Sequence, residues 1–436
     1  ITLLLFTCLL FTKSRSGILA FGISSIVFWG YQILKTKSLK SAIILNSLFL
    51  ILLLVIKTPV RDLLIRTPAP EQKTSQGPAL ETGGTESGEI RKIVWKGALA
   101  AWRDGPKNFW IGTGPETFAM AYYAHRPVEH NNTSEWELLY NKAHNEFLNF
   151  LTTTGLLGLL SYIVLLASMG YMILNTKYVI QNQTSFALFA GWLSLSVTNF
   201  WGFSVVITQI LLFLMPALAI SLTIQPSNHI ATARISKPQI ILLALVFLVL
   251  STLLLALMRY WLADIHYAAG QKHLLTFSAT QESQSILDSY TEYGAAYQLN
   301  STEPVIAADF SIAAAYASIL SRESDATSAA TLAQLAEVVS SQAIDQSPTH
   351  PNYYKTQARM YLVLAAYEEK YLDAADAVLA QAALISPTDP RIPYNRSLVA
   401  KYKEDKDTQI KHLQDAVRLR PAYQPALDLL LNDKIK

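Results

Sequence analysis

The stretch QIILLALVFLVLSTLLLALM, residues 239–258, decides the fold class of this chain. It carries no charge and is long enough to cross the roughly 30 Å hydrocarbon core of a bilayer, which takes about 20 helical residues. A helix of this composition has no polar face to present to water. We therefore predict a transmembrane helix here. The rest of the sequence consists of further apolar runs of this kind and of polar regions.

The composition of the whole chain is poor in charged residues. Of 436 residues, 51% are hydrophobic and 15% are charged, against roughly 25% charged in ordinary soluble domains. The formal net charge of +3 is too small to indicate a nucleic-acid partner. The single cysteine, Cys8, leaves no disulfide framework and no cysteine-based metal site. Because the chain starts with Ile1 inside an apolar run, we expect the native N-terminus and further spans to lie upstream.

We predict an all-α protein: a polytopic membrane helix bundle with an extracytoplasmic loop domain, followed by a soluble α-helical repeat domain. The predicted spans are 1–12, 17–34, 41–56, 156–174, 185–200, 203–222 and 239–258, with a tight hairpin at 199–202. The predicted domains are membrane spans at 1–56, an external loop at 57–150 with a flexible linker at 66–89, membrane spans at 151–258, and repeats at 259–436.

Basic residues in short loops indicate which side of the membrane each loop occupies. Three lysines fall within residues 35–40, between two spans, so this loop is predicted to be cytoplasmic. Alternation then places the loop 57–150 and the domain 259–436 outside. It leaves the loops containing Lys177 and residues 225–238 inside.

Lys13 and Arg15 break this rule, because they occupy a short connection on the outer side. Two cations there oppose the predicted orientation. They either extend toward lipid phosphates or have a functional reason to be there.

The region after residue 259 contains paired helical patterns. An alanine followed five positions later by a proline closes three of the predicted helices: Ala343/Pro348, Ala382/Pro387 and Ala416/Pro421. Pro387 and Pro421 are 34 positions apart, which is the period of a tetratricopeptide repeat. The region is therefore similar to tetratricopeptide repeats, which implies a binding surface for a partner or an acceptor; a purely structural role is about equally open.

The external loop has two parts. Residues 66–89 are rich in Pro, Gly, Thr, Ser and Glu, which is typical of a flexible linker. From Ile90 the apolar residues fall at helical spacing, and Asp104-Gly105-Pro106 ends that helix. A glycine turn, an aromatic stretch Tyr122-Tyr123-Ala124-His125-Arg126, and His144-Asn145-Glu146-Phe147-Leu148 follow.

Three pieces of this sequence resemble the C-terminal catalytic region of the O-antigen ligase and O-antigen polymerase family. They are Thr12-Lys13-Ser14-Arg15-Ser16-Gly17, the segment from Arg91 through Gly112-Thr113-Gly114 to Phe118, and His144 through Gly158. Together they cover about residues 1–225. The sequence departs from the family at Ser16, an added residue before Gly17, and at the linker 66–89, which has no counterpart.

The resemblance implies a bacterial inner-membrane enzyme that moves a glycan from undecaprenyl pyrophosphate to a hydroxyl on a glycan, lipid or protein acceptor. Arg15 and Arg91 would hold the pyrophosphate, since guanidinium groups grip phosphate oxygens in pairs. His144 would take the acceptor proton. The reaction would invert the anomeric carbon and use neither metal nor cofactor. The further substrate-binding candidates are Lys13, Asn145, Tyr123 and Arg126.

Several alternatives remain. Within the family, a ligase, a polymerase and a protein O-oligosaccharyltransferase share these motifs. A zinc site formed by His125, His130 and His144 is disfavoured, because the spacing matches no compact metal motif. Tyr122, Tyr123 and Trp136 either stack on sugars or anchor at the membrane interface. A non-enzymatic scaffold and, more weakly, a transporter are the competing functional classes.

Overall fold

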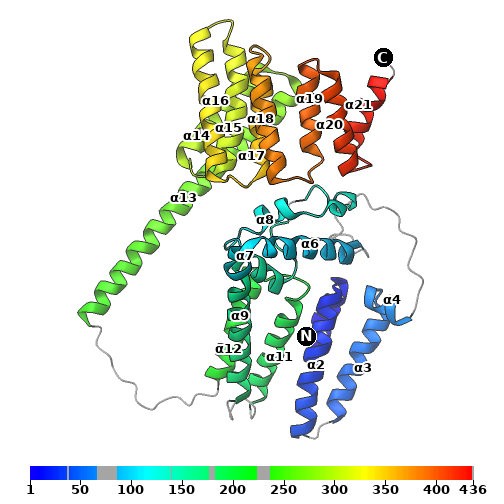
Figure 1. Ribbon diagram of the computed structural model, residues 1–436. Helices are drawn as coiled ribbons and strands as arrows, with labels where there is room; N and C mark the ends of the chain where they lie inside the picture. The colour runs from blue at the N-terminus through cyan, green and yellow to red at the C-terminus, as the bar shows by residue number, and fades with distance from the viewer. Residues whose placement is uncertain (37–38, 66–85, 139, 176–181, 223–235, 435–436) are drawn as a thin grey trace. The chain divides into compact units, whose positions relative to one another are not determined.

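The computed structural model describes the chain except for residues 37–38, 66–85, 139, 176–181, 223–235 and 435–436 (Figure 1). Every regular element in the described ranges is a helix, which confirms the predicted all-α fold. The chain divides into two compact units, residues 1–228 and 229–436. The basic loop residues Lys37, Lys177 and Arg234 lie outside the described residues.

The first unit contains the predicted apolar helices. They are α1 (Thr2–Phe11), α2 (Arg15–Thr36), α3 (Leu39–Val55), α9 (Glu146–Asn175), α11 (Gln183–Thr198) and α12 (Val206–Ser221). Of these, α2 and α9 are long and apolar enough to cross a bilayer, and α1, α3 and α12 are shorter apolar helices. Many of their leucine, isoleucine and valine side chains are exposed, which suits lipid rather than water. Together with α13 of the second unit, they make this a multi-pass membrane protein.

The predicted reversal at 199–202 is present between α11 and α12. The Asn199 side chain donates to Ser204 Oγ at 3.0 Å. The Asn199 carbonyl accepts a hydrogen bond from the Glu146 backbone N–H at 2.8 Å. The turn therefore lies beside the first residue of α9.

The loop between α3 and α9 is built from short helices. They are α4 (Pro59–Ile65), α6 (Glu86–Arg103), α7 (Gly105–Ile111), α8 (Phe118–His125) and the 3-10 helix η1 (Val128–Asn132). Helix α6 starts four residues before the predicted Ile90, inside the expected linker; the remainder of that linker, 66–85, lies outside the described residues. In Figure 1, α6 lies across the end of α9.

Helix α9 begins earlier than predicted and is interrupted at Gly155, whose φ is +68°. The glycine turn after α7 docks at this interruption: Thr113 N–H donates to Thr152 O at 3.0 Å and Gly114 N–H to Thr153 O at 2.8 Å. A Cβ on Gly112 would lie 2.3 Å from the Thr153 carbonyl carbon. Only glycine permits so close an approach of two backbones.

The second unit is an array of antiparallel helix pairs. It consists of α13 (Lys237–Thr280), α14 (Ser283–Leu299), α15 (Pro304–Ser321), α16 (Ala326–Gln346), α17 (Pro351–Leu364), α18 (Lys370–Ile385), α19 (Arg391–Tyr402), α20 (Lys406–Leu419) and α21 (Gln424–Lys434). The three alanines predicted to close helices, Ala343, Ala382 and Ala416, are fully buried near the ends of α16, α18 and α20. Although α15 is apolar enough to span a membrane, most of it is buried inside the unit.

Helix α13 joins the predicted span to the repeat array without a break. Its apolar first half is exposed along its length, whereas Ala263 and Gly270 in its second half are buried. Gly270 packs against the Tyr293 ring of α14, and its carbonyl accepts from Ser289 Oγ at 2.9 Å. The predicted span 239–258 is therefore the first half of a longer helix.

We expect Gly112→Ala to destabilise the first unit by about 2–4 kcal/mol. Overpacking costs roughly 1–3 kcal/mol, and a Cβ at positive φ adds about 1 kcal/mol. Gly105→Ala is the matched control, because its φ is +90° but the added Cβ would meet nothing within 4 Å. Thermal unfolding in detergent measures both. Equal losses in the two variants would contradict the role of the close backbone contact.

Candidate active site

Helix α6 and the segment before α9 share a small hydrophobic core. Its buried members are Ile90, Val94, Ala98, Phe118, Tyr122, Tyr140 and Ala143. Trp95 Nε1 donates to the Ala143 carbonyl at 3.0 Å. This contact fixes the backbone immediately before His144 against α6.

His144 lies just in front of α9 in a left-handed backbone conformation, with φ +51°. Non-glycine residues adopt this conformation at a cost, and such strain is found preferentially at functional sites. The half-buried imidazole packs against the Tyr140 ring (5.5 Å between centroids) and the Phe203 ring (5.1 Å). Burial, then the charge of Arg91, lowers the pKa of His144 to about 4. The ring is therefore neutral near pH 7.

Arg91 projects from α6 toward the same place. Its Nε atom is buried and has no hydrogen-bond partner among the described residues. Burial lowers the pKa of Arg91, Tyr140 and Glu135 act to raise it, and Arg15 also lowers it. Arginine stays charged after such shifts because its ordinary pKa is above 12. Arg91 therefore offers a positive charge with spare donor capacity beside His144.

Arg15 is the first residue of α2 and is exposed. Its charge acts on Arg91, so the two predicted phosphate-binding arginines converge although they lie 76 positions apart. Lys13 is exposed in the turn before α2, with φ +53°. It lines a pocket of about 410 Å³ together with Lys57, Thr58 and Asp62, beside the ends of α1 and α3.

The other predicted binding residues are buried. Asn145 is 2% exposed, and its Oδ1 accepts from the Leu148 N–H at 3.0 Å, so it caps α9. Tyr123 is buried in α8. Arg126 donates to His130 Nδ1, Asn131 Oδ1 and the Trp136 carbonyl. In this structure Asn145 and Arg126 make contacts that hold the loop in shape.

The three histidines of the loop have different surroundings. His130 is fully buried, and burial followed by the charge of Arg126 lowers its pKa to about 3. His125 Nε2 lies 3.3 Å from Asp104 Oδ2. Among the residues that the structure describes, no three His, Cys, Asp or Glu side chains gather as metal ligands would.

The sequence interpretation missed Glu135 and Tyr140. The Glu135 carboxylate is 3% exposed and accepts a hydrogen bond from the Tyr140 hydroxyl. Both groups act electrostatically on Arg91. A lone acidic residue between Ser134 and Trp136 has no helical or motif context, so no sequence signal marked it.

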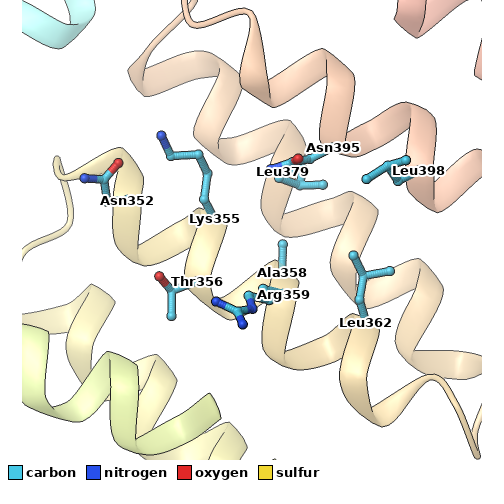
Figure 2. A pocket seen from close by; sticks show the side chains of 9 residues that line it. All are labelled: Asn352, Lys355, Thr356, Ala358, Arg359, Leu362, Leu379, Asn395 and Leu398. Carbon is cyan, nitrogen blue, oxygen red and sulfur yellow. The ribbon is translucent and has the colours of Figure 1, made fainter. Parts of the chain in front are cut away.

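The second unit has a separate groove with a volume of about 500 Å³. Its lining residues are Asn352, Lys355, Thr356, Ala358, Arg359, Leu362, Leu379, Asn395 and Leu398, from α17, α18 and α19 (Figure 2). Lys355 Nζ lies 2.9 Å from Asp389 Oδ2, and that carboxylate also pairs with Arg391. The groove therefore combines an apolar floor with amide and cationic groups.

The site geometry defines a helical membrane protein with arginines and a neutral histidine gathered at one end of its spans. Residues 1–163 match the family model of the O-antigen ligase. This part of the chain, which holds Arg15, Arg91 and His144, is therefore similar to O-antigen ligases. The match indicates a membrane protein with glycosyltransferase-like function. No curated protein matches the chain.

The charge of Arg91 should be measurable at His144. In Arg91→Met we expect the pKa of His144 to rise, because removing a nearby positive charge favours the imidazolium form. The pH dependence of diethyl pyrocarbonate labelling, read by mass spectrometry, reports the titration of this ring. His273, in the second unit, should label identically in both proteins. An unchanged titration of His144 would show that Arg91 does not face it.

Proposed function

We propose that the first unit transfers a glycan from undecaprenyl pyrophosphate to an acceptor hydroxyl, as an O-antigen ligase-like enzyme. The observation that carries the proposal is the convergence of Arg15, Arg91 and His144 from three separate segments. All three lie within the residues that match the family. They lie at one end of the bundle, which we assign to the outer face of the bacterial inner membrane.

In the proposed reaction, a neutral His144 nitrogen takes the proton of the acceptor hydroxyl. The hydroxyl oxygen attacks the anomeric carbon from the face opposite the pyrophosphate, so the configuration inverts. The bond between that carbon and the pyrophosphate oxygen breaks, and undecaprenyl pyrophosphate leaves with the electron pair. Arg91 and Arg15 stabilise the negative charge that develops on the leaving group. No step requires a metal or a cofactor.

Donor binding also changes the pKa of the proposed base, His144. In the free site the positive charge of Arg91 keeps the pKa of His144 low, which makes the ring a weak base. A bound pyrophosphate adds negative charge beside the arginines and raises this pKa toward neutrality. His144 becomes a better base once the donor is in place.

The other predicted residues have supporting roles in this proposal. Lys13 reaches the lipid-facing end of the donor from the edge of the site. Asn145 fixes the start of α9 and with it the position of His144. Arg126 and Tyr123 stabilise the loop from its interior. They therefore affect substrate binding through the shape of the loop and do not contact the substrate.

Alanine variants of His144, Arg91 and Arg15 should lose transfer from a purified undecaprenyl-pyrophosphate glycan while remaining folded. General base catalysis contributes roughly 100- to 10,000-fold, so His144→Ala should lose about that much activity. Arg103→Ala is the matched control, since it removes an exposed arginine from the same helix as Arg91. Full activity in the His144 and Arg15 variants would rule out the proposal.

The dependence of activity on pH provides a second test. The acid limb of kcat/KM reports the free enzyme and that of kcat reports the donor complex. Because the donor raises the pKa of His144, the acid limb of kcat should lie at higher pH than that of kcat/KM. Coincident limbs, or the reverse order, would contradict the proposed coupling between pyrophosphate and His144.

A second candidate function, a membrane-anchored scaffold, is favoured by the groove between α17 and α19. Its amides, cations and apolar floor suit a segment of a protein partner. Growth and surface-glycan phenotypes separate the two functions. The enzyme requires His144 and tolerates Arg359→Ala with Leu398→Ala in the groove; the scaffold shows the reverse dependence.

A further inference from the structure

The imidazole of His144 makes no hydrogen bond to any group in the described part of the chain, although the proposed reaction depends on its orientation. A functional histidine usually has its ring fixed by a hydrogen bond from one nitrogen to a carboxylate or a backbone carbonyl. The His144 ring instead packs edge-on against two aromatic rings, those of Tyr140 (5.5 Å between centroids) and Phe203 (5.1 Å). Its orientation therefore depends on what holds these two rings in place.

Phe203 belongs to the turn between α11 and α12, and this turn is attached to the start of α9. The residue after Phe203 is Ser204, whose backbone N–H donates to the Glu146 carboxylate, with 3.4 Å between Ser204 N and Glu146 Oε2. The Glu146 backbone N–H donates to the Asn199 carbonyl at 2.8 Å. One residue of α9 thus binds both ends of the turn that carries Phe203.

The same turn also has internal hydrogen bonds and a second contact with α9. Asn199 Nδ2 donates to Ser204 Oγ at 3.0 Å and to the Tyr162 hydroxyl at 3.5 Å. The backbone between Asn199 and Ser204 is therefore closed into a loop, and Glu146 and Tyr162 set its position on α9. Because Glu146 is two residues after His144, one short segment carries the imidazole and also holds the turn that packs on it.

Glu146 is a buried carboxylate for which the proposed reaction has no use. It is 7% exposed and forms no ion pair at contact distance within the described ranges. The nearby Lys142 ammonium pairs with Glu116 instead, at 2.5 Å. Burying a carboxylate without an opposite charge is costly. The contact with Ser204 gives this carboxylate a role, which is to hold the turn.

We propose that Glu146 is a positioning residue for the proposed base: by holding the turn between α11 and α12, it keeps the Phe203 ring edge-on against the His144 imidazole. The inference rests on the proposed function, in which a His144 nitrogen must point at the acceptor hydroxyl. Without the Glu146 carboxylate, the Ser204 backbone loses this anchor and Phe203 moves off the ring. The imidazole then turns among several orientations, and few of them point a nitrogen at the hydroxyl.

Two substitutions of Glu146 separate its hydrogen bond from its charge. Glu146→Ala removes the acceptor, and we expect kcat to fall about ten- to a hundredfold, because a misplacement of roughly 1 Å can cost about a hundredfold. KM should change little, since the affected step is proton removal and not donor binding. Glu146→Gln keeps an oxygen that can accept the Ser204 N–H and should retain most of the wild-type kcat. Equal losses in the two variants would show that the negative charge itself is required, which would overturn the inference.

A double-mutant cycle tests whether Glu146 acts through Phe203. Phe203→Leu removes the ring contact and should reproduce the loss of kcat in Glu146→Ala. The double variant should lose no more than either single variant, because both changes break the same contact. Trp201→Leu is the matched aromatic control, since Trp201 lies in the same turn but packs on Phe200. Losses that multiply in the double variant would contradict the inference.

The rate at which diethyl pyrocarbonate labels His144 at one fixed pH needs no turnover and reports how well the ring is covered. This rate should rise severalfold in Glu146→Ala and in Phe203→Leu. It should stay at the wild-type value in Glu129→Ala, which removes an exposed carboxylate from the same unit. His130 is fully buried and should stay unlabelled in every folded variant. A lower melting temperature with unchanged His144 labelling in Glu146→Ala would mean a merely structural role and would overturn the inference.

The labelling also separates this inference from the proposed function. If the wild-type chain transfers no glycan, the proposed function fails, and the labelling rates still decide whether Glu146 holds Phe203 on the His144 ring. If the wild-type chain is active and Glu146→Ala matches it in kcat and in labelling, the inference alone fails. If Glu146→Ala does not fold, which labelling of His130 would reveal, Phe203→Leu decides the question. Wild-type kcat and labelling in that variant would overturn the inference.

Discussion

Two backbone N–H groups, those of Thr113 and Gly114, donate to the carbonyls of Thr152 and Thr153, and the whole loop depends on this contact. An unbroken helix would use both carbonyls internally. The left-handed Gly155 interrupts that ladder, and Gly112 lets the second backbone approach. Because α7 is anchored there, α6 lies against the first turns of α9, where Thr152 Oγ1 donates to the Ala98 carbonyl. The site is assembled where the loop and the span share backbone hydrogen bonds.

The charges of the site follow from the same anchoring. Docking α6 on α9 places the partly buried Arg91 where its charge acts on His144 and where the charge of the exposed Arg15 acts on it. A partly buried positive charge of this kind is stabilised when an anion binds beside it. Burial of the imidazole, together with the charge of Arg91, lowers the pKa of His144 in the same arrangement.

Much of this arrangement could be predicted from the sequence, for identifiable reasons. Apolar runs mark α2, α9 and α12 directly, because burial in lipid needs only composition and length. The residues proposed for chemistry fell inside recognisable motifs. The sequence did not reveal Glu135 and Tyr140, since their importance lies in contacts with residues from other segments. The left-handed backbone conformation of His144 and the packing of its ring on Phe203 could not be predicted either. No local sequence pattern encodes a contact between residues nearly 60 positions apart.

The second unit constrains how a partner could reach the membrane. Helix α13 is continuous from its exposed apolar half through the half that packs on α14, so the repeat array cannot rotate independently of its own span. A flexible linker at residue 259 would have allowed the array to drift away. The continuous helix instead fixes the array to its own predicted span. A protein bound in the groove of α17 and α19 would therefore be held at a fixed position relative to that span.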